Sequence, residues 1–291
     1  FYLFILGEFQ FAPINKSLVR THKKEMINFS FFAILGTLGT TLCTQIDSIM
    51  ITELVDVRSN GIYSIGRNIS NVVSIPAKAV FVILAPIITK LIAEKKIKEV
   101  GKTYKESSNV LLTTGLFIFL GLTVALTDIV TFLNRNEINY SELISVVSIL
   151  GFSILFNLVT SINAHIIFYS KYYRFNVVVV LTLGLSNIFL NYLFIHTLDF
   201  GLLGAAYATA ISLMISDVVK FVFVLIKFKM QPFERNTLWV ALIGTSIYVL
   251  FLFFDFQFSP VTNILLKELL LMALFIPVSY THLRAHETTD N

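Results

Sequence analysis

Long apolar runs separated by short polar segments fill most of this chain. The runs lie at 27–54, 61–89, 109–133, 143–169, 174–198, 201–227, 238–256 and 262–278. A helix rises about 1.5 Å per residue, so about 20 apolar residues are enough to cross a bilayer. The runs lack the period-two alternation that marks the roughly 10-residue strands of an outer-membrane barrel. The pattern therefore predicts an all-α integral membrane protein with eight transmembrane helices.

The composition agrees with a membrane protein. Hydrophobic residues make up 56% of the sequence and charged residues 14%, whereas ordinary soluble domains have roughly 45–50% and 25%. The sequence contains no Gly-rich phosphate loop, nucleophile elbow or zinc signature. We therefore expect a protein that is not an enzyme, with no cofactor, no metal and no nucleic-acid partner.

Both ends of the sequence differ from the regular pattern. The chain begins with Phe, and "FYLFILG" reads as the last turns of a span, so we expect residues 1–26 to be the end of a preceding helix and a basic loop. Residues 279–291, "SYTHLRAHETTDN", resemble a translated sequencing-adapter tail and are expected to be non-native. His282, His286 and Glu287 have a spacing typical of metal ligands, but within such a tail they give no reason to expect a metal site.

Lysine and arginine gather in alternate connections between the runs. The basic connections hold Lys16, Arg20, Lys23, Lys24, Lys90, Lys95, Lys96, Lys98, Lys102, Lys105, Lys171, Arg174, Lys227, Lys229 and Arg235. The opposite connections carry only Arg58 and Arg135. The positive-inside rule then predicts that both ends of the chain lie in the cytoplasm. The basic connector 90–107 is either a solvated charge run, which is the simpler interpretation, or an interfacial helix on anionic lipid.

Four polar residues follow one face of the second run. Arg67, Asn71, Ser74 and Lys78 are spaced i, i+4, i+7 and i+11, which a regular helix places on one side. A cation that faces lipid at bilayer depth costs about 2.5–3.5 kcal/mol on insertion scales, so such residues normally face a bundle interior or a wet cavity. We therefore take the four as candidate substrate-binding residues. Pro76 beside them removes a backbone donor and predicts a kink.

Internal ion pairs are the competing interpretation of the buried charges. Asp47 and Arg67 lie at matching depth in an antiparallel helix pair, which predicts an ion pair, although Arg67 is also close enough to the end of its run to reach the interface. Asp217 lies at the depth of Lys78, but Lys220 at i+3 is a nearer partner. Asp47 and Asp217 are thus candidates either for ion pairing or for coupling to an ion. Lys78, near the middle of its run, has the weakest structural explanation.

Uncharged polar residues recur at helical spacing in three later runs. They are Ser153, Asn157, Ser161 and His165, then Asn187 and Asn191, then Thr209, Ser212 and Ser216. We expect most of them to make hydrogen bonds between helices, a minority to contact substrate, and His165 to pack rather than to carry protons.

Two segments resemble a known family of transporters. In the run 163–212, Asn187 and Asn191 form an "N…LN" pattern, followed by a brief loop and the small-residue entry "GLLGAAYAT" (201–209). This run resembles the end of a lobe in the polysaccharide flippases of the multidrug/oligosaccharidyl-lipid/polysaccharide (MOP) superfamily. "QIDSIMITEL" and "NGIYSIGRNISNVVSIPAKAVFVILAP", with Asp47 and Pro86, resemble the opening of a lobe in Wzx-type O-antigen flippases.

The resemblance implies an architecture and a function. Residues 27–227 would be the second six-helix lobe of a two-lobe transporter, residues 238–278 two extra helices, and the first lobe a missing partner. The implied activity is export of an undecaprenyl-pyrophosphate-linked oligosaccharide, an O-antigen, capsular or exopolysaccharide repeat unit, across the bacterial inner membrane by alternating access. The implied partners are membrane lipid and a candidate coupling ion, H+ or Na+. The alternatives are a drug or cation antiporter of the same superfamily, which would depend on Asp47 and Asp217, and a membrane-embedded polysaccharide polymerase or ligase.

Overall fold

The computed structural model describes residues 16–133, 140–253 and 258–287, and these ranges contain helices and connections but no strand. The helices are α2 (Lys16–Leu54), α3 (Val57–Ser70), η1 (Asn71–Ser74), α4 (Ile75–Ala93), α5 (Ile97–Leu133), α6 (Ser141–Thr160), α7 (Ile162–Tyr169), α8 (Phe175–Asn191), η3 (Tyr192–Thr197), α9 (Gly201–Phe228), α10 (Arg235–Leu252) and α11 (Pro260–Glu287). The predicted all-α class is confirmed.

Each of the eight predicted runs is helical over most of its described residues, but the runs differ in how well they suit a bilayer. The run 238–256 extends past the end of α10 at Leu252, and residues 254–257 lie outside the described part of the chain. Five described segments are long and apolar enough to cross a membrane: Val57–Ala93, Ile97–Phe132, Ser141–Thr160, Phe175–Thr197 and Gly201–Phe228. Asn236–Phe251 is a shorter apolar helix. α2 and α11 extend beyond the predicted runs 27–54 and 262–278 because polar residues continue the helix at those ends. The side chains of His282, His286 and Glu287 lie outside the described part of the chain.

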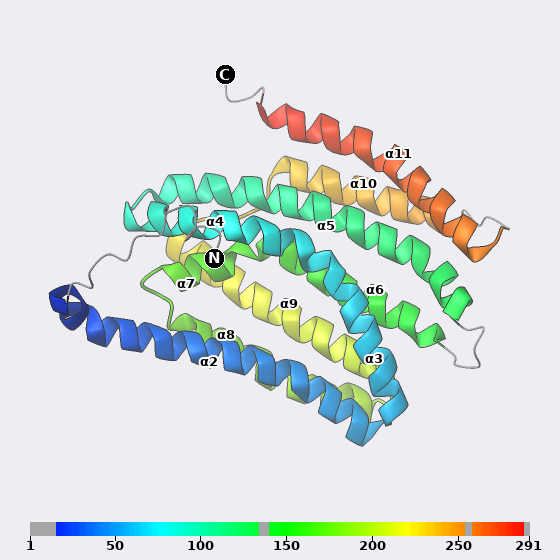
Figure 1. Cartoon of the computed structure of the whole chain (residues 1–291), viewed down its shortest axis with the longest axis horizontal. Helices are drawn as coiled ribbons and strands as arrows, with labels where there is room; N and C mark the ends of the chain where they lie inside the picture. Colours follow the sequence, from blue (N-terminus) through cyan, green and yellow to red (C-terminus); the bar gives the residue numbers. More distant parts are fainter. Residues whose placement is uncertain (1–15, 134–139, 254–257, 288–291) are drawn as a thin grey trace, which may run out of the picture.

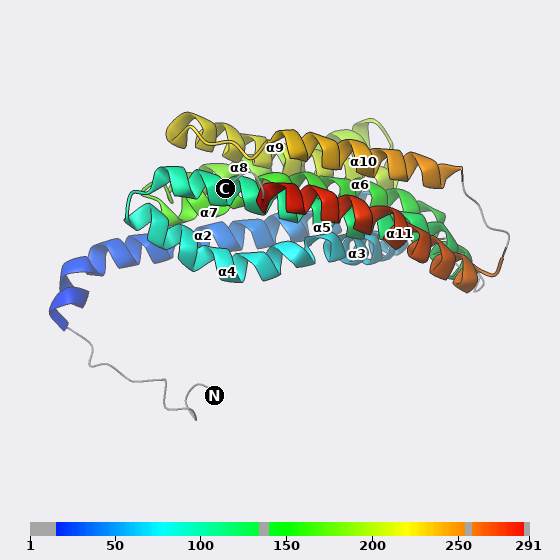
Figure 2. The ribbon, with the colours of Figure 1, turned by 90° about the horizontal axis from the view of Figure 1, so that it is seen from above.

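The helices lie along one common direction, with the connections gathered at the two ends of the bundle (Figure 1). α6 and α9 pack together in the middle, and α9 also packs on α8, which in turn contacts α2. α5 contacts α4 and α6 on one side and α10 and α11 on the other, so the last two helices lie beyond α5 and away from α2 and α8 (Figures 1 and 2).

The second predicted span is interrupted where Pro76 was expected to kink it. Pro76 lies in the first turn of α4 and has no N–H to give the carbonyl of Val72. The N–H of Ile75 bonds that carbonyl instead, which produces the 3₁₀ segment η1. Four residues at three per turn rather than 3.6 rotate the following helix by roughly 80° relative to a regular α-helix.

A close backbone contact fixes the start of α9, where the sequence places its small residues. Gly201 has a φ of +53°, a conformation that costs glycine little. A Cβ on Gly204 would lie 2.9 Å from the backbone carbonyl carbon and oxygen of Phe194 in η3. Ala205 and Ala206 are fully buried at the same contact region. Small side chains therefore let two helical segments approach closely, as expected for packing in lipid.

Buried polar contacts attach α10 and α11 to α5. Near one end, Lys267 Nζ lies 2.7 Å from Asp128 Oδ2, and Asn263 donates to Asp128 Oδ1 at 3.1 Å. Near the other end, Thr237 donates to Asn109 Oδ1 at 2.6 Å, and Asn109 donates to Glu234 at 3.1 Å. The last two helices are thus fixed to the bundle by directional contacts as well as by apolar packing.

We expect Gly204→Ala to lower the stability of the folded protein by about 1–3 kcal/mol, because the added methyl group must displace the Phe194 backbone. The matched control is Gly61→Ala in α3, where a Cβ meets nothing within 4 Å and helix propensity favours alanine. Thermal unfolding in detergent measures both. Equal melting temperatures for the two variants would contradict the close contact.

The Asp128–Lys267 pair allows a double-mutant cycle. Asp128→Leu and Lys267→Leu should each destabilise the protein by about 3–5 kcal/mol, because each leaves one buried charge without its partner. The double variant should lose less than the sum of the two, because no charge is then stranded. Additive losses in the same unfolding assay would show that the pair does not couple α11 to α5.

Candidate functional site

A partly open cavity with several polar side chains in its wall, here called the polar cavity, lies between α2, α3, η1, α6, α8 and α9. Its volume is about 290 Å³. The polar residues that line it are Asp47, Arg67, Ser70, Asn71, Ser74, Ser153, Asn157, Asn187 and Thr209. Leu150, Ile154, Leu183 and Leu213 supply the apolar part of its wall. The cavity therefore combines a cation, an acid, hydroxyls and amides within an apolar protein.

Three of the four residues of the predicted stripe meet in this cavity. Arg67 from α3 and Asn71 and Ser74 from η1 all line it. Lys78 does not line it, and its side chain is exposed. The physical reason is the 3₁₀ segment, which rotates α4 away from the face that α3 presents. The structure thus corrects the single-face geometry, while a role of Lys78 in substrate binding stays a prediction.

Asp47 is the centre of a buried hydrogen-bond network. Its side chain is 2% exposed, and its Oδ1 accepts from the amides of Asn187 at 2.8 Å and Asn191 at 2.9 Å. Its Oδ2 accepts from the hydroxyl of Tyr63 at 3.2 Å. The Tyr63 oxygen also lies 2.9 Å from Thr209 Oγ1, so one carboxylate connects α2 with α8, α3 and, through Tyr63, α9.

The expected common depth of Asp47 and Arg67 agrees with the structure, because both line the same cavity.

An unused acceptor lies in each of the two amides that hold Asp47. The side-chain oxygens of Asn187 and Asn191 are buried and have no hydrogen-bond partner among the described residues. Buried polar atoms without partners are costly, so two unsatisfied acceptors lie in the amides that hold Asp47.

Asp217 forms a second buried polar centre, on the other side of Asn157. The carboxylate is 2% exposed and pairs with Lys220 through Oδ1, as the i+3 spacing predicted. Asn157, which lines the cavity, donates to the same oxygen at 2.8 Å. The Oδ2 atom of Asp217 has no hydrogen-bond partner among the described residues. Asn157 therefore connects the cavity to a carboxylate whose charge is already matched by Lys220.

The remaining predicted polar residues divide into two groups. Asn157, Asn187, Asn191 and Thr209 contact other helices through Asp217, Asp47 and Tyr63. Ser153 and Ser161 instead donate to carbonyls of their own helix, Leu150 and Leu158. Ser161 lies at the break between α6 and α7, so the predicted span 143–169 is two helices.

His165, Ser212 and Ser216 lie outside the cavity lining. The ring centroid of His165 lies 4.1 Å from that of Phe81 and 6.0 Å from that of Tyr169, which is the packing role that the sequence favoured. Ser212 and Ser216 are buried in α9, and the Ser212 hydroxyl has no partner among the described residues.

Sequence reasoning missed the ion pair of Asp128 and Lys267, although a signal was present. Asp128 lies five residues before the end of the run 109–133, and Lys267 lies five residues after the start of the run 262–278. If the runs alternate in direction, these two ends lie on the same side of the membrane. The depth count that linked Asp47 with Arg67 would have paired them. The buried hydroxyl of Tyr104 and the amide of Asn163 were also missed; neither makes a hydrogen bond within the described residues, and no sequence pattern brings α5 and α7 together.

No protein-family model and no curated protein matches the sequence. Solved structures match it in fold. The lipid II flippase MurJ, in an inward closed conformation, aligns with a TM-score of 0.56 and 21% identity over 84% of this chain and 52% of MurJ. The chain therefore shares its fold with about half of that structure.

Two further solved structures align less closely. An outward-facing multidrug resistance transporter of the MATE family aligns with a TM-score of 0.48 and 19% identity, over 79% of this chain and 53% of its own. A MOP superfamily transporter from Pyrococcus furiosus aligns with a TM-score of 0.48 and 18% identity, over 78% of this chain and 52% of its own. This chain therefore spans about half the length of the structures that it matches.

We expect Asp47→Ala to destabilise the protein strongly, because the amides of Asn187 and Asn191 and the hydroxyl of Tyr63 lose their acceptor together. A buried donor left without a partner costs about 1–3 kcal/mol. Glu53→Ala is the matched control, because it removes an exposed acid from the same helix. Thermal unfolding in detergent measures both variants. A loss for Asp47→Ala no larger than that of the control would show that the network does not hold the helices together.

Proposed function

We propose that this chain is one lobe of a flippase that exports a lipid-linked oligosaccharide across the bacterial inner membrane. The proposed substrate is an O-antigen or capsular repeat unit on undecaprenyl pyrophosphate, moved by alternating access without breaking a bond. The observation that carries the proposal is the polar cavity with Arg67 in its wall, inside an apolar bundle of the MOP transporter fold. A pyrophosphate needs fixed cations in a medium of low dielectric constant, where charge interactions are stronger than in water.

The lining residues suit the two chemical parts of such a headgroup. The planar guanidinium of Arg67 can donate two parallel hydrogen bonds to a phosphate. Asn71, Ser74 and Asn157 offer amides and hydroxyls of the kind that bind sugar hydroxyls. A cavity of about 290 Å³ is at the small end of ligand sites, which fits one half of a site completed by a second lobe. Lys78, which is exposed, would then face that lobe.

The Asp47 network is the proposed coupling site for H+ or Na+. Rotation of the amides of Asn187 and Asn191 would turn two neutral oxygens toward the carboxylate, and carboxylate and carbonyl oxygens are the ligands that hard cations take. Protonation of Asp47 would instead weaken its three hydrogen bonds. Asp217 is less suited to this role, because its charge is matched by Lys220.

Two other functions are weighed against the flippase. A drug or cation antiporter of the same fold would depend on Asp47 and Asp217 and would have no use for Arg67 as a phosphate ligand. A polysaccharide polymerase or ligase would need catalytic side chains in an outer loop; the candidate loop 134–142 is short, and most of it lies outside the described residues. The cavity therefore favours transport of an anionic substrate.

The test is export of surface polysaccharide in a flippase-deficient strain, with this chain joined to a complete first lobe. Arg67→Gln should reduce export by at least about tenfold at equal membrane level, because one charged hydrogen-bonded contact to phosphate is worth about 1.5–3 kcal/mol. Arg67→Lys should retain part of the activity. Lys78→Gln should also reduce export if Lys78 faces the substrate from the rim.

The matched control is Arg58→Gln, which removes an exposed arginine from the same helix, α3. It should export normally. Normal export by Arg67→Gln would contradict phosphate binding in the cavity. If Arg67→Gln exports normally while Asp47→Asn abolishes resistance to cationic drugs, the antiporter is the better interpretation.

A further inference from the structure

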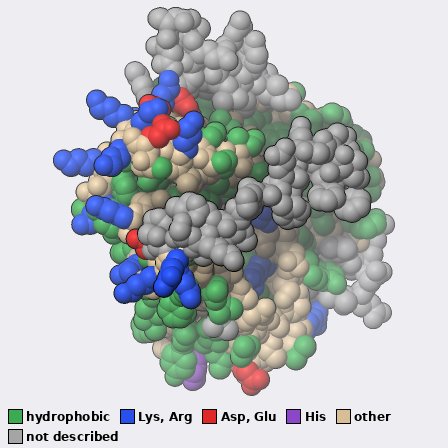
Figure 3. Space-filling model, turned by 60° about the vertical axis from the view of Figure 1, so that its left-hand side comes forward, with side chains coloured by type: hydrophobic (Ala, Val, Ile, Leu, Met, Phe, Trp, Pro, Cys, Tyr) green, Lys and Arg blue, Asp and Glu red, His purple; other side chains and the backbone are tan. Residues whose placement is uncertain are grey.

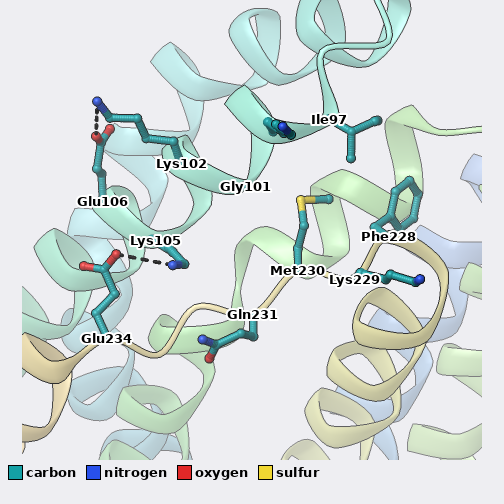
Figure 4. A pocket seen from close by; sticks show the side chains of 11 residues that line it. Ile97, Gly101, Lys102, Lys105, Glu106, Phe228, Lys229, Met230, Gln231 and Glu234 are labelled. Carbon is teal, nitrogen blue, oxygen red and sulfur yellow. Dashed lines mark ion pairs between the residues drawn. The ribbon is translucent and has the colours of Figure 1, made fainter.

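A second, larger pocket opens at the basic end of the bundle, where Lys and Arg side chains gather on the surface (Figure 3). It has a volume of about 690 Å³ and lies between the first turns of α5, the end of α9 and the linker 229–234 (Figure 4). It shares no residue with the polar cavity. It is therefore a separate site, and its use does not depend on the proposed transport function.

The pocket carries an excess of positive charge. Its charged lining residues are Lys98, Lys102, Lys105, Lys229, Glu106 and Glu234. Lys105 Nζ lies 3.7 Å from a carboxylate oxygen of Glu234, and Lys102 Nζ lies 3.8 Å from one of Glu106. Four lysines and two glutamates leave a net charge of +2, and among the described residues neither Lys98 nor Lys229 makes an ion pair. The pocket therefore suits an anion.

The other wall of the pocket is apolar. Figure 4 shows Ile97, Met230 and Phe228 on the side opposite the two ion pairs. Met230 is buried against α5, with its sulfur 3.3 Å from the position that a Cβ on Gly101 would take. Lys229 ends α9 in a left-handed conformation with a φ of 56°. This turn directs the chain out of the helix, so that Met230 is buried while Lys229 stays exposed.

An apolar stripe leads from the pocket along α9. Val222, Leu225 and Ile226 are spaced i, i+3 and i+4, so they share one face at the end of α9. They are 42%, 41% and 66% exposed, respectively. An exposed apolar stripe on a helix suited to cross a bilayer is a surface for acyl chains. The stripe ends three residues before Lys229, which lines the pocket.

We propose that this pocket binds the headgroup of an anionic phospholipid of the cytoplasmic leaflet, with its acyl chains along α9. The positive-inside rule places the basic end at that leaflet, and basic pockets between helices on the cytoplasmic side suit anionic headgroups. The phosphate lies between Lys98 and Lys229, and the glycerol contacts the wall formed by Met230 and Phe228. A soluble anion would satisfy the lysines but would leave the adjoining apolar stripe unused.

Bound lipid would also support the attachment of α10. Glu234, in the pocket wall, forms a capping box with Thr237 at the start of α10, and its carboxylate accepts from Asn109 of α5. A headgroup beside the linker 229–234 therefore contacts the segment that joins α9 to α10.

The experiment is native mass spectrometry of the whole chain purified in detergent, titrated with phosphatidylglycerol or phosphatidylcholine. The wild type should bind phosphatidylglycerol more tightly than phosphatidylcholine. Lys98→Gln/Lys229→Gln should weaken phosphatidylglycerol binding by about tenfold and leave phosphatidylcholine binding unchanged, because two charges near the lipid surface are lost. The matched control is Lys90→Gln/Lys95→Gln, which removes two charges from the same end of the molecule outside the pocket and should bind as the wild type does.

Several outcomes would overturn the proposal. Unchanged phosphatidylglycerol preference in the pocket variant would show that the lipid binds elsewhere. An equal loss in the control variant would indicate general attraction to the basic surface. Inorganic phosphate or glycerol phosphate that displaces the lipid at equal concentration would show a site for soluble anions. Normal unfolding temperatures for both double variants, measured without added lipid, confirm that each comparison is made on folded protein.

Discussion

The buried carboxylate of Asp47 is the interaction on which the arrangement of the cavity depends. In a bilayer there is no water to satisfy a buried acid, so its acceptor capacity must be met by the protein. Asn187 and Asn191 from α8 and Tyr63 from α3 donate to it, and Thr209 extends the network into α9. These contacts fix α2 beside the helices that line the cavity, so the position of Arg67 follows from the network around Asp47.

Polar contacts have the same role elsewhere in the bundle. The Asp217–Lys220 pair with Asn157 ties α6 to α9, and the Asp128–Lys267 pair with Asn263 ties α5 to α11. Apolar side chains pack as well against lipid as against one another, so they specify the relative positions of membrane helices weakly. A few buried hydrogen-bonded charges supply the specificity. The protein therefore has several small polar centres, each joining a different set of helices.

Much of this structure could be predicted from the sequence, because its signals are local or depend on depth alone. The apolar runs are largely helical, Pro76 marks a break, and Asp217 pairs with Lys220. The same reasoning placed Arg67, Asn71 and Ser74 together correctly. It failed for Lys78, because the spacing argument assumes a regular helix through η1. It also could not bring Tyr104 of α5 near α7, or form the pocket at Lys229, because those features depend on how separate helices approach one another.

The 3₁₀ segment η1 has a consequence for the charge of the cavity. The carbonyl of Val72 accepts from Ile75 because residue 76 is proline and has no N–H. Any other residue at position 76 would bring a second donor for that carbonyl, and a continuous α-helix would then carry Lys78 round to the side of Arg67. The number of cations facing the cavity thus depends on the backbone geometry that Pro76 favours. A family of chains with identical charged residues could differ in the electrostatic potential of this cavity through that single position.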